Sequence, residues 1–176
     1  MQMWVNNGTE LAELPVAHPS QECPMSNAAV QEIEKQVPAE HLPIYRLEAE
    51  LLKLPQVEMP VDHDFCNGLY ARTMHIPAGT VLTGAVHKDE SFFVVRKGHL
   101  IVTTDDGSAK VGPGFMSVTK PHTKRAGVAL TDVEVTTFHA NPTNETDPKT
   151  IWDMYTVPAP ALALEAVQHP HLEGAK

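Results

Sequence analysis

Cysteine, basic residues and long apolar runs are all scarce in this sequence of 176 residues. The two cysteines, Cys23 and Cys66, have no CxxC spacing, so we expect reduced thiols in a cytosolic setting rather than a disulfide framework. No segment approaches the roughly 20 apolar residues of a membrane span, and no N-terminal stretch combines basic residues with an apolar run. We therefore expect neither membrane insertion nor export through a signal peptide.

Acidic residues outnumber basic ones. The 22 Asp and Glu residues against 13 Lys and Arg residues give a formal net charge of -9 at pH 7. A negatively charged protein repels a phosphate backbone, so nucleic acid is not an expected partner. The sequence also lacks a G-x-S-x-G elbow, a P-loop and a G-x-G-x-x-G fingerprint. Nucleophilic serine catalysis, nucleotide hydrolysis and dinucleotide chemistry therefore have no support in the sequence.

The chain divides into three parts of different sequence character. Residues 1–61 form a polar arm interrupted by prolines, with short helices predicted at about 27–36 and 45–53. Residues 62–142 have the β-rich pattern of a barrel, and residues 143–176 form a turn-rich C-terminal extension with one apolar cluster that is expected to dock. A chain of this length suits one domain with extensions.

Short runs of β-branched and aromatic residues fill the middle part of the chain. Tight-turn signals separate these runs, including Lys97-Gly98 and Gly112-Pro113-Gly114. Eight short strands joined by such turns favour a closed or double-sheet barrel, because closure removes exposed strand edges. The predicted strands are 69–76, 81–87, 91–95, 99–104, 109–111, 115–118, 125–130 and 133–139.

A spaced pattern of residues runs from Gly79 through Ala85, His87 and Ser91 to Gly98. This spacing resembles the first motif of the cupin superfamily, G-x5-H-x-H-x(3,4)-E-x6-G. The two glycines keep the frame of the motif, whereas Ala85 stands in place of the first histidine and Ser91 in place of the glutamate. His87 is the only metal ligand that the resemblance carries over by position.

A second stretch, with Gly107 and Pro113, resembles the second cupin motif, G-x5-P-x-G-x2-H. By strict counting its histidine falls on Val118, and it falls on Arg125 if the loop 121–123 precedes it. Valine has no donor atom and arginine is a permanent cation, so neither is a metal ligand. The resemblance implies a mainly β fold, a cupin-type double-stranded β-helix (jelly-roll) barrel with short N-terminal helices and a degenerate metal site.

The stretch 68–142, with its segments 76–80 and 120–125, is similar to small cupin-like proteins encoded by tailed bacteriophages. That group has no single established chemistry. The resemblance implies a phage or prophage origin. With the lost metal ligands and the long flanking arms, it leads us to expect a non-catalytic accessory or assembly protein in the host cytoplasm or in the virion, rather than an enzyme. We therefore expect no cofactor, virion or other phage proteins as partners, and a homo-oligomer with a two-fold dimer as the default.

Three side chains are candidates for binding a small molecule. Arg72 and Arg125 are predicted to face an anion in a pocket, and His87 keeps the position of a cupin ligand. The alternative function is a small-molecule-binding cupin, or a metal-dependent cupin enzyme with relocated ligands. In the metal-dependent case His75, His87 and His139 are expected to hold a divalent transition metal, since neutral imidazoles suit Zn, Fe, Ni or Cu.

Overall fold

The structure is a computed structural model that describes residues 5–7, 37–104 and 107–158 of the chain. The helix predicted at 27–36 lies outside the described residues, and so does Cys23. None of the helices in these ranges has the length and hydropathy of a membrane-spanning segment.

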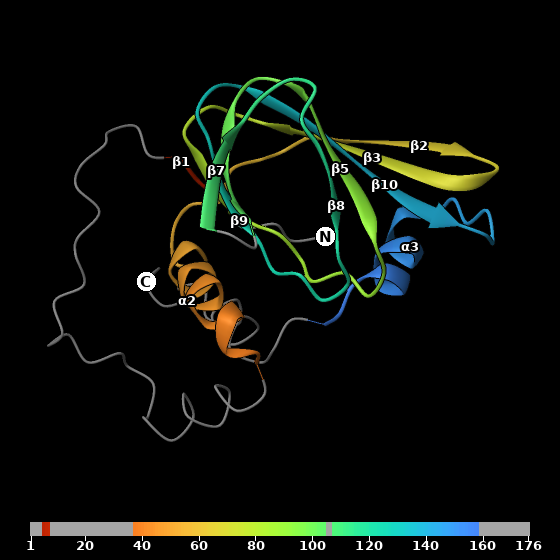
Figure 1. Ribbon diagram of the computed structural model, residues 1–176, viewed down its shortest axis with the longest axis horizontal. Helices are drawn as coiled ribbons and strands as arrows, with labels where there is room; N and C mark the ends of the chain where they lie inside the picture. Colours follow the sequence, from red (N-terminus) through yellow and green to blue (C-terminus); the bar gives the residue numbers. More distant parts are fainter. Residues whose placement is uncertain (1–4, 8–36, 105–106, 159–176) are drawn as a thin grey trace, which may run out of the picture.

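Within the described ranges, ten strands form two antiparallel sheets of five strands each, which face one another (Figure 1). The first sheet has the order β1-β4-β9-β6-β7, with β1 (Val5–Asn7), β4 (Thr80–Thr83), β9 (Ala126–Ala129), β6 (Leu100–Thr104) and β7 (Gly107–Val111). The second has the order β2-β3-β10-β5-β8, with β2 (Val61–Cys66), β3 (Gly68–Ile76), β10 (Val133–Asn141), β5 (Ser91–Lys97) and β8 (Met116–Thr119). Apart from the hairpins β2–β3 and β6–β7, successive strands alternate between the two facing sheets, as in a jelly roll, so the predicted fold class is confirmed.

The core lies between the two sheets, where alternate side chains of each strand point inward. On β10, Val133 and Val135 are buried, whereas Glu134 between them forms an ion pair with Lys97 on the outside, at 3.5 Å. Each fully buried aliphatic side chain stabilises the fold by about 1.5–3 kcal/mol. The buried core residues are Met74, Ile76, Leu82, Val95, Leu100, Val102, Val111, Ala129, Val133 and Val135.

The turn between β5 and β6 requires a glycine. Gly98 has a φ of +73°, and a Cβ atom built on it would overlap the carbonyl oxygen of Asp132. A side chain is therefore excluded both by the left-handed backbone and by the neighbouring loop. The next residue, His99, donates its backbone N–H to the Thr131 hydroxyl at 2.9 Å, which holds the β5–β6 turn against the β9–β10 turn. The last glycine of the first cupin-like motif thus marks a close approach of two loops.

The helix predicted at 45–53 exists but begins earlier. A 3-10 turn, η1 (Ala39–His41), leads directly into α2 (Leu42–Leu51). Pro43 lies in the first turn of α2, where the missing backbone N–H costs nothing because no helical carbonyl is available to accept from it. The prediction placed the helix start after Pro43 because it treated proline only as a helix breaker.

A buried ion pair joins α2 to the barrel. Lys124, in the loop before β9, donates to the carboxylate of Glu48, and both side chains are almost fully buried. The Lys124 ammonium also lies over the ring of Tyr45, 4.5 Å from its centroid. Because a buried charge is costly without a partner, this pair fixes the position of the loop that leads into the first sheet.

Removing one partner of this pair should destabilise the protein more than removing both. Glu48→Met and Lys124→Met should each lower the free energy of unfolding by about 3 kcal/mol, because the remaining charge stays buried without a partner. The double variant should recover most of that loss. Urea unfolding of the three variants and the parent chain measures the coupling. Additive losses would show that the pair does not hold α2 on the barrel.

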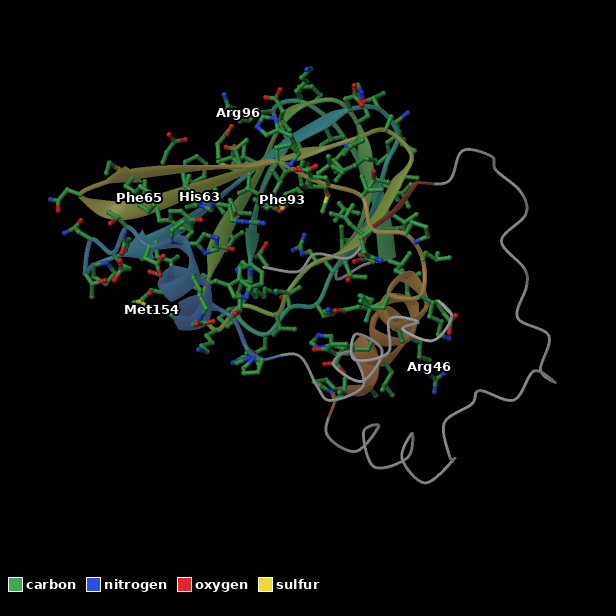
Figure 2. The ribbon with its side chains drawn as sticks, turned by 180° about the vertical axis from the view of Figure 1, so that it is seen from behind. Arg46, His63, Phe65, Phe93, Arg96 and Met154 are labelled. Atoms are coloured by element: carbon green, nitrogen blue, oxygen red, sulfur yellow. The ribbon has the colours of Figure 1, made fainter. Side chains whose placement is uncertain are left out.

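The second sheet extends beyond the barrel as a projecting hairpin. Its edge strand β2 was not predicted, because Asp62 and Asp64 interrupt the apolar pattern of a strand. Only one neighbouring strand, β3, pairs with β2. Figure 2 shows His63 and Phe65 on this projection, away from the barrel centre. His63 Nδ1 lies 2.6 Å from the Tyr70 hydroxyl on β3, which links the two strands by a side-chain hydrogen bond.

A C-terminal helix, α3 (Pro148–Tyr155), packs beneath the projecting hairpin (Figure 1). Asp147 caps its first turn by accepting from the backbone N–H of Thr150 at 2.8 Å. Ile151 and Tyr155 form a buried cluster with Tyr70 of β3. The chain after α3 returns to the barrel, where Val157 donates its backbone N–H to the carbonyl of Val86 at 2.9 Å. The apolar cluster of the C-terminal extension is thus docked at the end of the barrel.

Candidate functional site

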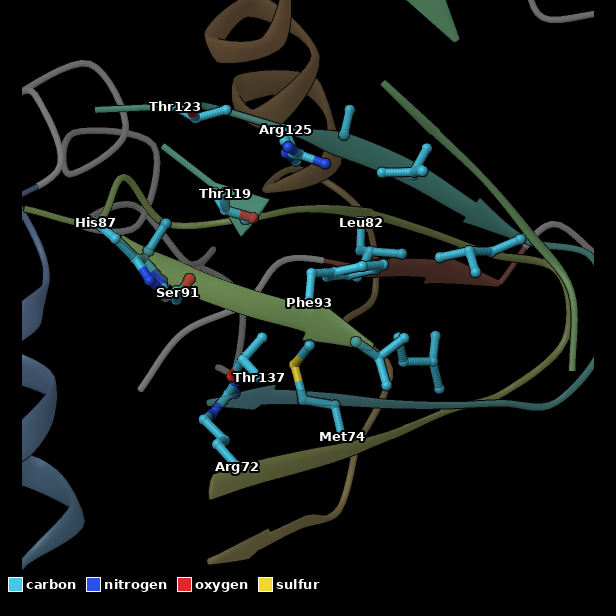
Figure 3. Close-up of a pocket in the computed structure, with 18 of the residues that line it drawn as sticks. Arg72, Met74, Leu82, His87, Ser91, Phe93, Thr119, Thr123, Arg125 and Thr137 are labelled. Atoms are coloured by element: carbon cyan, nitrogen blue, oxygen red, sulfur yellow. The ribbon is translucent and has the colours of Figure 1, made fainter. Parts of the chain in front are cut away.

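A cavity of about 100 Å³ lies between the two sheets. Inward-facing side chains of both sheets form its walls, and Trp152 of α3 completes its edge (Figure 3). Its polar lining residues are Arg72, His87, Ser91, Thr119, Thr123, Arg125 and Thr137. Its larger apolar lining residues are Met74, Ile76, Leu82, Phe93, Leu100, Val102, Val135 and Trp152.

The residues at the ligand positions of the first cupin-like motif, and one of the two candidates for the second, line this cavity. Ala85, His87 and Ser91 come from the first motif, and Arg125 comes from the second. Val118, the other position that counting allowed for the last ligand, lies on β8 and is 48% exposed. Of these two positions, Arg125 is therefore the one that lines the cavity.

The side chains at these positions do not fit a metal ion. Ala85 has no donor atom and Arg125 is a cation, which leaves His87 and the weak hydroxyl ligand Ser91. Among the described residues, no group of three or more His, Cys, Asp or Glu side chains is placed to hold a metal. A transition metal needs about three such ligands at one point.

The metal site predicted from His75, His87 and His139 is not assembled. Residues Arg72, Met74 and Ile76 of β3 line the cavity, so the odd-numbered His75 points to the other face of the sheet. There its Nε2 atom lies 2.7 Å from the Asp62 carboxylate on β2, at a partly exposed position.

The other two histidines lie side by side. His87 follows β4, His139 lies on the inward face of β10, and their ring centroids are 5.0 Å apart. His139 Nε2 lies 3.1 Å from the hydroxyl of Thr137, two residues earlier on the same face. The Nδ1 atom of His87 is buried and has no hydrogen-bond partner among the described residues. This nitrogen is therefore available to a ligand in the cavity.

Burial keeps both imidazoles neutral. Desolvation, with a smaller contribution from the Arg72 cation, lowers the pKa of His87 to about 4. Desolvation, followed by the effects of His87 and Arg72, lowers the pKa of His139 to about 3. At neutral pH the pair carries no charge, so each ring has one nitrogen that donates and one that accepts.

Arg72 lies between the barrel cavity and α3. Its side chain is 7% exposed and lines both the main cavity and a smaller space of about 20 Å³ beneath α3. The guanidinium carbon is 5.7 Å from the centroid of the Trp152 ring, a distance at which a cation is attracted to the ring face. Burial lowers the pKa of Arg72 to about 10, so it stays charged at neutral pH.

Arg125 brings a second positive charge to the cavity wall. It immediately follows Lys124, whose side chain is turned toward Glu48 of α2, whereas the Arg125 side chain lines the cavity (Figure 3). The Nε atom of Arg125 is buried and has no hydrogen-bond partner among the described residues. None of the described residues lining the cavity is acidic. The site therefore favours a negatively charged group.

The structure places all three predicted small-molecule-binding residues, Arg72, His87 and Arg125, around this cavity. Their role in binding stays a prediction. Sequence reasoning missed Thr137 and Trp152. Thr137 lies two positions before His139 on one strand, so strand alternation could have found it. No sequence signal could have found Trp152, because its place depends on how α3 docks.

No protein-family model matches the chain, and no curated protein matches it. Among solved structures, it is similar to a cupin-2 domain protein from Shewanella frigidimarina, with 13% identity, 48% of this chain and 80% of that chain covered, and a TM-score of 0.39. It is also similar to KdgF from Halomonas, with 19% identity and a TM-score of 0.42, and the match covers 49% of this chain and 84% of KdgF. A third similar structure is salicylate 1,2-dioxygenase from Pseudoaminobacter salicylatoxidans, with 17% identity and a TM-score of 0.45. The match covers 66% of this chain and 34% of the dioxygenase. At these identities the likeness concerns the fold and assigns no activity.

The two neutral histidines should make the protein less stable in acid. Their folded-state pKa values of about 4 and about 3 lie below the unfolded value of 6.5, so the unfolded chain binds more protons below pH 6.5. The stabilisation is complete above about pH 6.5 and is lost as the pH falls toward 4 and 3, by at most about 1.4 kcal/mol per pH unit for each histidine.

Urea unfolding at a series of pH values measures this loss. His139→Phe, which keeps a ring beside Tyr155, should lose stability more gradually as the pH falls, because one neutral histidine is gone. The carboxylates titrate equally in both proteins and cancel in the difference. Parallel pH profiles for the two proteins would contradict a buried neutral His139.

Proposed function

We propose that this cupin-type barrel binds a small organic anion without a metal, and that Arg125 and Arg72 supply the positive charge. In a metal-dependent cupin the ion attracts and orients anionic ligands at this point of the barrel. Here a guanidinium extends from one of the ligand positions into the same space. A guanidinium matches the two oxygens of a carboxylate in a bidentate hydrogen bond.

The observation that carries the proposal is the buried, unpartnered Nε atom of Arg125 in a cavity whose described lining has no acidic side chain. A buried cation is costly unless an anion compensates for it. The neighbouring Lys124 meets this requirement through Glu48. Arg125 has no such carboxylate in the described part of the chain, so a bound anion is the natural partner.

The remaining polar groups fit the same role. Neutral His87 offers the unpartnered Nδ1 atom, which donates or accepts according to its tautomer. The hydroxyls of Ser91, Thr119 and Thr123 line the same cavity as Arg125 and can donate to the oxygens of an anion. These groups can bind and orient a ligand. We therefore propose binding rather than catalysis.

The accessory or assembly role that the phage resemblance implies stays a prediction. No contact among the described residues bears on a virion partner or on a second copy of the chain. A ligand-binding barrel is compatible with such a role, because a scaffold can also hold a small molecule.

Loss of the Arg125 charge should weaken anion binding. Phosphate, acetate, propionate and succinate are each added to the protein, and binding is followed by calorimetry and by the melting temperature. We expect at least one of them to bind, and Arg125→Met to weaken that binding about 10- to 100-fold, because a hydrogen bond to a charged group contributes about 1.5–3 kcal/mol.

Arg96→Met is the matched control. Arg96 is an exposed residue of β5 that lies outside the cavity (Figure 2), so this change alters the net charge equally but leaves the site intact. It should leave the affinity unchanged. If both variants weaken binding to the same extent, or if no anion binds the parent chain, the proposal is wrong.

A further inference from the structure

The cavity is polar at one end and apolar at the other. In Figure 3, His87, Ser91 and Thr123 lie at one end, whereas Leu82 and Phe93 lie toward the other. A ligand that consisted only of a charged group would leave the apolar end empty. A purely apolar ligand would leave the buried Nε atom of Arg125 without a partner. The two ends together therefore call for a ligand with a charged head and an apolar tail.

The register between β3 and β10 explains why the cavity lining changes from polar to apolar at one point along these strands. On β3, Arg72 is followed by Met74 on the same face, and on β10, Thr137 lies opposite Arg72 while Val135 lies opposite Met74. Both strands thus change from polar to apolar at the same step, which spans about 6.6–6.8 Å along a strand. The boundary is a property of the sheet and not of one side chain.

The size of the cavity limits the length of the apolar tail that a ligand can have. Its volume is about 100 Å³. A cavity of about 150 Å³ is known to hold benzene, so this cavity takes a smaller body. A carboxylate with a tail of two or three carbons is of about this size, whereas a long fatty acid is not.

We propose that the ligand is a short-chain monocarboxylic acid of about three to five carbons, an inference that rests on the proposed anion site. Its carboxylate is bound by Arg125 with Arg72 nearby, and its alkyl tail lies against Met74, Val135 and Phe93. A dicarboxylate is disfavoured, because its second carboxylate would be buried against these apolar side chains without a partner.

A series of straight-chain acids tests whether the affinity depends on the length of the alkyl tail. The full chain is titrated by calorimetry with acetate, propionate, butyrate, pentanoate, hexanoate and octanoate, and in parallel with 1-butanol, succinate and phosphate. We expect the affinity to rise by about fourfold for each added methylene up to butyrate or pentanoate, as burial of a methylene predicts. It should then fall for hexanoate and octanoate, which exceed the cavity.

Phe93→Leu provides a matched variant that leaves the charged end unchanged. By enlarging the apolar end it should move the best chain length upward by about one carbon, the volume that the smaller side chain releases. A second measurement needs no variant: the terminal methyl of bound butyrate should show a nuclear Overhauser effect to the Met74 methyl group, and one to no other of the 7 methionines.

The outcomes separate the two proposals. Phosphate or succinate could bind through Arg125 while the affinity of the monocarboxylates does not depend on chain length. In that case the anion-site proposal stands and the proposal of a short-chain acid as the ligand is wrong. An affinity that still increases at octanoate also overturns it. If 1-butanol binds as tightly as butyrate, or if no anion binds at all, the anion site itself fails and this inference fails with it.

Discussion

The position of one guanidinium inside an apolar barrel is the constraint on which the rest of the site depends. Arg125 lines the cavity, and its Nε atom is buried without a partner among the described residues. A charge buried in a protein is costly without a partner. The surrounding groups must therefore either tolerate that charge or bind an anion.

Two helices at the barrel wall support this arrangement. On one side α2 supplies Glu48, which pairs with Lys124 and so fixes the segment that leads into Arg125. At the barrel end α3 brings Trp152 to the cavity edge and to the Arg72 guanidinium. The fold thus holds one cation by a carboxylate, another beside an aromatic ring, and leaves the third facing the cavity. These are three different ways to keep a positive charge inside a negatively charged protein.

The sequence predicted the barrel well because the signals for it are local. The left-handed turn at Gly98 and the alternation on β10 each leave a pattern within a few residues of sequence. The site was less predictable, because it depends on which faces meet. Arg72 and His75 are three positions apart on one strand and so cannot share a face, which excludes one of the two predicted ligand sets. The choice between Val118 and Arg125 required the strand register, and Trp152 required the docking of α3.

The central claim is that the positive charge of the cavity comes from arginine and not from a metal. The most direct test is elemental analysis of the purified protein, with anion binding measured before and after dialysis against a chelator. The account predicts less than about one tenth equivalent of any divalent metal and the same affinity in both titrations. About one equivalent of metal, together with binding that disappears after chelation and returns when the metal is restored, would contradict it.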